Sequence, residues 1–366
     1  MIFKFFKKKP KSKLGIDIGT SSIKVVQLRK EKDKFKLETY GELSFLAYLE
    51  RTKESFQTTA LKTLEAITRE MLKNLLEKSE IITRHVVMAI PVFSSFTSVL
   101  ELPNMADKEL ARAVEFEARK YVPISLSQVV LDWKIIESGI IKNGATAKPF
   151  KGKRILLIAV PKEVVNKYII LADGLGLSID ALELESSSLT RALVGKEKLP
   201  ACVLDIGARA TSFTIIDRGM LQMSHSLDVA GAEMTKILAN AMKVEIKRAE
   251  DFKKSYGTDN KEDKESKREL RELLQTSIDK IADESERLIN SYQAKTNRKI
   301  EKLILNGGSA QLSGIGEYME ERLSIKPVVA DPWSKVDYPP ALELVLKEIG
   351  PQFSVAAGAA MREGKK

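Results

Sequence analysis

One pattern occurs twice in this chain, and it constrains the fold more than any other feature. In each copy an apolar run leads into an aspartate, an isoleucine and a glycine, first from Asp17 and again from Asp205, 188 positions later. A short tip and a second apolar run follow, as in a β-hairpin. A single hairpin of this kind also occurs in ordinary turns. The repeat instead predicts a duplicated α/β lobe, with one hairpin in each half closing on a phosphate chain.

The first hairpin, 14–28, contains the groups needed to hold a phosphate. Gly19 lets backbone N–H groups approach an oxyanion, and Lys24 supplies a cation on the return strand. Asp17 could bind Mg²⁺ directly or through its waters, because this ion prefers oxygen ligands. Hydroxyl donors follow the glycine at Thr20, Ser21 and Ser22.

A third motif lies late in the chain. The apolar run 303–305 leads into Asn306-Gly307-Gly308-Ser309 and then into an expected helix. A glycine-rich turn at such a place lets the backbone lie against a flat ligand and offers N–H groups at a helix start.

In this order, the two hairpins and the glycine turn resemble the actin-like ATPase superfamily. The resemblance implies an α/β fold of two duplicated, ribonuclease H-like lobes that bind ATP and Mg²⁺ between them, with the metal held by Asp17 and Asp205, directly or through water. The residues carried over to the phosphates are Asp17, Gly19, Thr20, Ser21, Ser22 and Lys24 in the first loop, and Asp205, Gly207, Ala208, Arg209 and Ala210 in the second. Those carried over to the adenosine are Gly307, Gly308 and Ser309, with Gly231, Lys236, Glu250, Lys253 and Lys254 on the nucleoside side.

The second loop departs from the superfamily pattern, because Ala208 and Ala210 stand where hydroxyls are usual. This predicts fewer phosphate contacts from that loop. Glu185 begins the helix between the lobes, where bacterial actins often carry an acid that orients water. The same carboxylate could simply stabilise the helix N-terminus. We therefore expect ATP binding rather than rapid turnover, with slow hydrolysis at most acting as a conformational switch.

Within the superfamily the chain resembles the PilM family of type IV pilus assembly proteins. The resemblance rests on the lysine-rich start leading into 14–19, and on Ala89-Ile90-Pro91, Glu101-Leu102-Pro103 and the run 115–123. It implies a cytoplasmic adapter at the face of the inner membrane that docks the N-terminal cytoplasmic tail of the membrane protein PilN. The docking site is expected within 41–153 or in its groove with the first lobe. Other pilus platform proteins and pilus motor ATPases are further expected partners.

Other proteins with this fold have different functions. FtsA, a membrane-associated filament protein of cell division, also has an inserted subdomain but usually ends in a linker and an amphipathic helix. Here 352–362 resembles a helix that connects the lobes, with four residues after it, which favours PilM. Two further alternatives stay open for this chain. As a small-molecule kinase it would need an acceptor pocket between the lobes, and as a polymerising filament protein it would pellet in an ATP-dependent manner.

These motifs predict a layout for the whole chain. A basic and aromatic tail, 1–13, precedes lobe I, which is expected at 14–40, 154–200 and 351–366. An inserted, FtsA-type αββαβ subdomain occupies 41–153. Lobe II is expected at 201–243 and 300–350, with a helical subdomain at 244–299. The almost wholly apolar run 154–160 is expected to be a central strand of lobe I, buried on both faces.

Charge and composition limit the kinds of binding partner that we expect. The formal net charge of +10 raises nucleic acid or an anionic membrane as a partner. No recognition helix, zinc spacing or aromatic stacking set accompanies the basic residues, so we do not expect nucleic acid binding. The tail 1–13 could be a solubilising terminus or a weak interfacial anchor on anionic lipid. Every apolar run is shorter than the roughly 20 residues of a membrane span, and the single cysteine, Cys202, excludes an intrachain disulfide.

Overall fold

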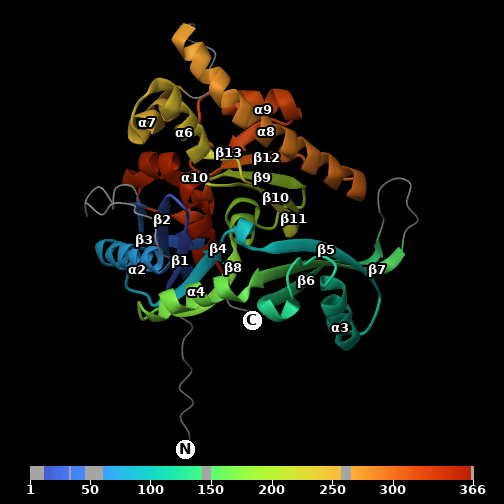
Figure 1. Cartoon of the computed structure of the whole chain (residues 1–366). Helices are drawn as coiled ribbons and strands as arrows, with labels where there is room; N and C mark the ends of the chain where they lie inside the picture. Colours follow the sequence, from blue (N-terminus) through green and yellow to red (C-terminus); the bar gives the residue numbers. More distant parts are fainter. Residues whose placement is uncertain (1–11, 33, 46–60, 142–149, 257–264, 364–366) are drawn as a thin grey trace, which may run out of the picture.

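The computed structural model describes residues 12–32, 34–45, 61–141, 150–256 and 265–363. The predicted tail 1–13 therefore lies almost entirely outside the described residues. Three β-sheets organise the described part of the chain, two of them large and one small (Figure 1). In these residues no helix is both long and apolar enough to cross a membrane.

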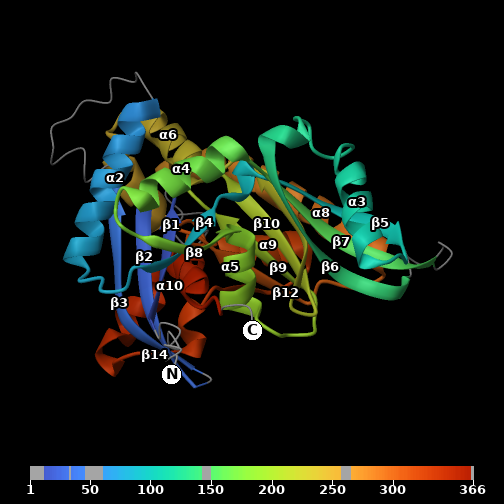
Figure 2. The same ribbon diagram turned by 90° about the horizontal axis from the view of Figure 1, so that it is seen from below.

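The first large sheet has the order β14-β3-β2-β1-β4-β8 and forms lobe I. An antiparallel meander of β1 (Ser12–Ile18), β2 (Ser22–Glu31) and β3 (Lys34–Ser44) is extended by β4 (His85–Ile90) and β8 (Ser178–Leu184), which run parallel to β1. Helices α2 (Leu61–Lys78) and α4 (Lys162–Asp173) bury the side chains on one face of this sheet. Helix α10 (Glu343–Ala360) lies on the other face (Figure 2).

The second large sheet repeats this topology and forms lobe II. Its order is β11-β10-β9-β12-β13, with β9 (Ala201–Ile206), β10 (Thr211–Asp217) and β11 (Met220–Leu227) as the meander, and β12 (Lys302–Asn306) and β13 (Pro327–Val329) parallel to β9. Helices α6 (Gly231–Met242), α8 (Glu265–Thr296) and α9 (Ile315–Leu323) cover one face, and α7 (Ile246–Tyr256) packs on α6. The predicted duplication of an α/β lobe is confirmed.

Helix α10 joins the two lobes, as the sequence predicted. It shares one buried apolar cluster with Val26 of lobe I and with Val203 and Ile304 of lobe II. Its backbone lies so close to β1 that a Cβ atom on Gly15 would be 1.9 Å from the carbonyl oxygen of Ala356. The glycine is therefore required by this packing. Helix α5 (Glu185–Leu189) and the π-helical turn η3 (Thr190–Val194) contact α10 and complete the junction.

The small sheet has the order β5-β7-β6 and carries helix α3 (Asp107–Ala118) on its own apolar core. Its strands are β5 (Phe96–Pro103), β6 (Val129–Ile141) and β7 (Phe150–Pro161), and the short turn η1 (Val92–Ser94) connects it to β4. Four further short elements are η2 (Leu126–Gln128), η4 (Pro332–Lys335), β14 (Val336–Asp337) and η5 (Pro340–Leu342).

The strand pairing differs from the predicted layout in three places. Strand β4, placed by the sequence in the 41–153 insertion, lies between β1 and β8 of lobe I. Strand β7, expected to be central in lobe I, is central in the small sheet instead. Its apolar residues are buried on one side under α3 and on the other against β4 and α4. The apolar pattern therefore predicted the burial of this strand correctly, but it did not predict which sheet the strand joins. Strand β14, expected in lobe II, pairs with β3 of lobe I.

Candidate functional site

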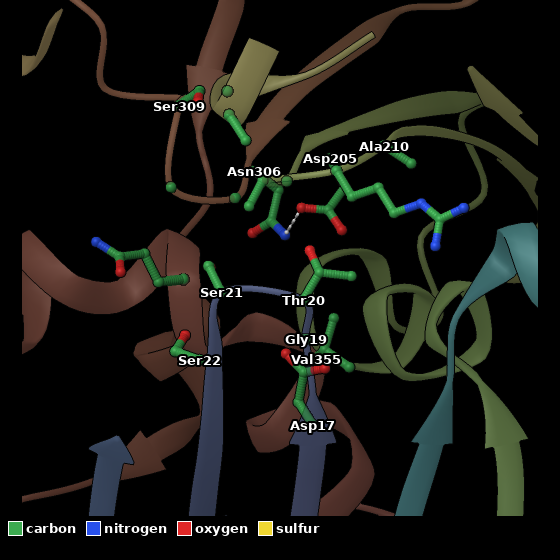
Figure 3. Close-up of a pocket in the computed structure, with 18 of the residues that line it drawn as sticks. Asp17, Gly19, Thr20, Ser21, Ser22, Asp205, Ala210, Asn306, Ser309 and Val355 are labelled. Atoms are coloured by element: carbon green, nitrogen blue, oxygen red, sulfur yellow. Dashed lines mark hydrogen bonds between the residues drawn. The ribbon is translucent and has the colours of Figure 1, made fainter. Parts of the chain in front are cut away.

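The tips of the two predicted hairpins and the glycine turn converge on one cavity between the lobes, with a volume of about 490 Å³ (Figure 3). The two tips are built alike. The N–H of Gly19 donates to the carbonyl oxygen of Ser22 at 3.0 Å, and the N–H of Gly207 donates to that of Ala210 at 3.2 Å. Asp17 rises from lobe I on one side of the cavity, and Asp205 projects from lobe II on the other.

The lobe I side of the cavity carries a cluster of charges on adjacent strands, in which Asp17 and Lys24 are buried and Glu42 is exposed. Asp17 of β1, Lys24 of β2 and Glu42 of β3 lie in register across the sheet. The Lys24 ammonium donates to Ser22 Oγ at 2.6 Å and lies 3.3 Å from Glu42 Oε1. The only predicted cation of this hairpin is thus fixed between two acids and a hydroxyl.

The lobe II side depends on a residue that the sequence analysis did not assign to the site. Asn306, at the end of β12, donates through Nδ2 to Asp205 Oδ1 at 2.9 Å. Its Oδ1 atom is buried and has no hydrogen-bond partner among the described residues. The next residue, Gly307, has φ of +87°, and a Cβ there would lie 2.5 Å from the carbonyl oxygen of Ile206. Only glycine fits this conformation and this approach.

Asp17, Asp205 and Glu185 face one another in the cavity, and the Lys24 charge offsets only part of their repulsion. The pKa of Asp205 is raised to about 6, chiefly by burial; the Asn306 hydrogen bond opposes the rise and the nearby Asp17 charge adds to it. Burial raises the pKa of Asp17, against the effect of Lys24. Burial and repulsion from both aspartates raise the pKa of Glu185 well above its ordinary value. A bound cation would relieve this repulsion, so the donor set fits Mg²⁺. Among the described residues, no cluster of three or more His, Cys, Asp or Glu residues forms a metal site by itself.

The nucleoside side is formed by α6, α7 and the glycine turn. The buried Lys253 ammonium donates to the carbonyl oxygen of Gly231 at 3.0 Å, to Thr235 Oγ1 at 2.8 Å and to Glu250 Oε2 at 2.7 Å. Its burial lowers the pKa of Lys253, while the paired Glu250 has a lowered pKa despite its own burial. This network fixes α7 against the start of α6.

All but one of the predicted nucleotide-site residues line this cavity, and Glu185 lines it as well. The exception is Lys236, which is exposed on α6 and is not among the lining residues. Lining residues that the sequence analysis did not assign to the site include Glu42, Phe93, Ser212, Ser226, Thr235, Asn306, Gln352 and Val355. The Arg209 guanidinium, at the tip of the second hairpin, lies 4.9 Å from the centre of the Phe93 ring.

Comparisons with known proteins agree with this architecture. The solved structure of a PilM–PilN type IV pilus biogenesis complex superposes with a TM-score of 0.79 at 22% identity, over 96% of this chain and 98% of that one. MreB5 of Spiroplasma citri bound to ADP superposes with a TM-score of 0.53 at 14% identity, over 95% and 94%. At these identities the likeness establishes the actin-like fold.

Sequence relatives point the same way. The cell division protein FtsA of Staphylococcus epidermidis is 24% identical over 198 residues, which cover 48% of this chain and 42% of that protein. The chain thus matches less than half the length of this curated relative. The family model described as type IV pilus assembly protein PilM matches residues 15–364. With nearly its whole length matched, the chain belongs to the PilM family of type IV pilus assembly proteins.

Proposed function

We propose that this chain is a cytoplasmic adapter that binds ATP and Mg²⁺ between its lobes and docks the N-terminal cytoplasmic tail of the inner-membrane protein PilN. One observation carries the nucleotide part: two hairpin tips, a glycine turn and the start of α6, far apart in sequence, line a single cavity. Asp17 and Asp205 would hold the metal, and the hairpin tips would hold the phosphates. A bound Mg²⁺ would supply positive charge where the two aspartates now repel each other.

The test of the nucleotide site is a double substitution. Asp17→Ala with Asp205→Ala is expected to abolish Mg²⁺-dependent ATP binding in calorimetry, because both candidate metal-side carboxylates are removed. Lys236→Ala is the matched control, since this cation of α6 lies outside the cavity. Unchanged affinity of the double variant would refute the site.

The proposed docking place is a groove of about 230 Å³ on lobe I, lined by α2, α4 and the end of β1. Ile170 of α4, which is 57% exposed, lines it, with Arg69 and Lys167 at the same groove. An apolar floor flanked by two cations and one acid, Glu65, is a surface that a short peptide segment can occupy. The structure of a PilM–PilN complex among the neighbours supports PilN as that partner.

The groove and the cavity share structural elements. Ile18 lines the groove, while its neighbour Asp17 lines the cavity. Tyr168 also lines the groove, and its hydroxyl is close enough to Glu185 and Asp17 that both carboxylates, after burial itself, raise its pKa. A peptide in the groove would therefore contact the residues that adjoin the bound phosphates, which is how nucleotide state and docking would be coupled.

Docking is tested by charge insertion. Ile170→Asp is expected to eliminate capture of the PilN tail in a pull-down, because it places a carboxylate in the apolar groove. Leu344→Asp is the matched control, at an even more exposed apolar residue of α10 outside the groove. Equal capture by the two variants would contradict the assignment. Other platform proteins and motor ATPases would be scored in the same assay.

Hydrolysis is proposed to be slow, with Glu185 orienting water. The N–H of Val92 donates to Glu185 Oε2 at 3.2 Å, so the carboxylate also anchors the turn η1 between lobe I and the small sheet. A Glu185→Ala variant that hydrolyses ATP as fast as the parent chain would remove this residue from the mechanism.

A further inference from the structure

We propose that the hydroxyls of Ser212 and Ser226 receive the terminal phosphoryl group of a nucleoside triphosphate and make the site distinguish triphosphate from diphosphate. Neither residue belongs to a loop predicted from the sequence. Both line the cavity between the lobes, on strands β10 and β11. The inference rests on the proposed ATP site and assigns its γ-phosphate end.

A row of polar residues crosses four strands of lobe II at this point. Asn306 of β12 pairs with Asp205 of β9, Asp205 pairs with Ser212 of β10, and Ser212 pairs with Ser226 of β11. Residues in register on neighbouring strands share one face of a sheet. All four line the same cavity, so the row is its lobe II wall.

The two serine hydroxyls have hydrogen-bonding capacity that the described residues do not use. Their Oγ atoms are buried, and neither has a hydrogen-bond partner among the described residues. Ser212 is only 6% exposed. Leaving a buried hydroxyl unpaired is unfavourable, so a lining pair of them in a cavity indicates a bound group that completes their hydrogen bonds.

The repeat explains why Ser212 lacks a partner. Ser212 is the counterpart of Lys24, since each lies seven residues after the aspartate of its hairpin. Lys24 donates to Ser22 Oγ, and the counterpart of Ser22 in lobe II is Ala210, which has no hydroxyl. The alanines of the second tip therefore remove hydroxyls from the loop, and the one missing at Ala210 leaves Ser212 unpaired on the strand behind it.

The direction of the row indicates which end of the nucleotide lies at the two serines. Its Asn306 end adjoins the glycine turn proposed for the adenosine, and its Ser226 end lies three strands away on β11. A nucleotide with its adenosine at Gly307 therefore reaches the serines with the far end of its phosphate chain. Serine hydroxyls can donate to phosphate oxygens and also accept from water.

The experiment compares the affinities of two nucleotides for the full chain with Mg²⁺ present, by calorimetry. The double variant Ser212→Ala with Ser226→Ala is expected to bind the non-hydrolysable triphosphate AMPPNP about tenfold more weakly, as two lost hydrogen bonds would produce. Its affinity for ADP is expected to stay within about twofold of the parent value.

Ser224→Ala is the matched control. Ser224 is also a serine of β11 with a buried, unpartnered hydroxyl, but it pairs with Thr214 rather than Ser212 and does not line this cavity. Its substitution is expected to leave both affinities unchanged. Equal losses for AMPPNP and ADP in the double variant, no loss at all, or a selective AMPPNP loss in Ser224→Ala would each overturn the inference. Failure of the parent chain to bind either nucleotide would instead overturn the proposed ATP site as a whole.

A second readout does not depend on the ligand. Because the two hydroxyls are unpartnered, the ligand-free double variant is expected to unfold at the same temperature as the parent or higher. A lower unfolding temperature would show that the hydroxyls serve the fold and would overturn the inference.

Discussion

The two hairpins have the same backbone geometry but different side chains. In each hairpin the glycine of an Asp-Ile-Gly sequence donates the same turn hydrogen bond, and each tip lines the cavity. In lobe I the cation, Lys24, lies on the return strand and is fully engaged by neighbouring groups. In lobe II the cation, Arg209, is at the exposed tip against Phe93, and the strand position carries the unpartnered Ser212.

This difference indicates a division of roles within a duplicated fold. Lobe I has its charges arranged before any ligand binds, because Lys24 is fixed between acids. Lobe II has unpaired donors and acceptors that a ligand would satisfy. The two copies have the same turn geometry, while their side chains at the cavity differ.

The largest expected effect comes from Lys24→Ala. Removing this buried cation leaves Asp17 and Glu42 without their shared partner, so we expect the free energy of unfolding to fall by about 2–4 kcal/mol. Urea denaturation at neutral pH measures the loss. Ser212→Ala, at the equivalent position of lobe II, is the matched control and is expected to cause no loss. If the two variants are equally stable, the proposed difference between the hairpins is wrong.

Asp205→Asn is expected to stabilise the ligand-free chain. The pKa of Asp205 is about 6 in the folded chain and near 3.8 when unfolded, so the folded state binds the proton more tightly. Its charge therefore destabilises the fold progressively as pH rises from about 4 to 6, and fully above pH 6. Because Asp205 keeps some solvent exposure, which screens its charge, we expect a gain of about 1–2 kcal/mol at pH 7.5.

Denaturation midpoints of Asp205→Asn and the parent chain, measured between pH 4.5 and 8, test this prediction. The gain should shrink toward the acid end of the range. Asp17→Asn provides the comparison across the lobes: it also removes the partner of Lys24, so its gain should be smaller. A gain for Asp205→Asn that grows as pH falls would contradict the assigned direction of the pKa shift.

The sequence was sufficient for the backbone of the site because repeated Asp-x-Gly and Gly-Gly patterns determine tight turns locally. It was insufficient for residues whose position depends on strand pairing. Ser212 and Ser226 lie in ordinary strand sequences, and only the register of β10 with its neighbours brings them to the cavity. Likewise, the apolar run of β7 predicts that this strand is buried, but the sheet that it joins depends on its pairing with β5 and β6.

Lys236, which the sequence predicted for the site, lies outside the cavity for a similar reason. Gly231 and Thr235 are four residues apart on α6 and both line the cavity. Lys236 is one residue further, which turns its side chain about 100° away from that face, into solvent. Helical phase from Gly231 would have selected Thr235 in its place.

Ala210→Ser tests the origin of the unpaired hydroxyl. It restores in lobe II the hydroxyl that Ser22 provides in lobe I, two residues before Ser212 and just before β10 begins. We expect the new hydroxyl to hydrogen-bond to Ser212 and to stabilise the ligand-free chain by about 0.5–1 kcal/mol in urea denaturation. Ala208→Ser adds the same group further from Ser212 and should not stabilise. An equal effect of both variants would mean that the second tip does not explain the unpaired Ser212.

An effect of similar size concerns Arg209, the cation that lobe II carries at its tip. Its guanidinium stacks on Phe93 of η1, at the base of the small sheet, and both side chains are exposed, so the contact is expected to contribute about 0.5–1 kcal/mol. A double-mutant cycle of Arg209→Ala and Phe93→Leu, measured by denaturation, isolates this term from other effects of either change. A coupling energy of zero would show that the tip of lobe II is not energetically connected to the small sheet. A coupling that disappears when Mg²⁺ and ATP are added would show instead that the nucleotide draws Arg209 away from Phe93, which would give lobe II a cation for the phosphates comparable to Lys24 in lobe I.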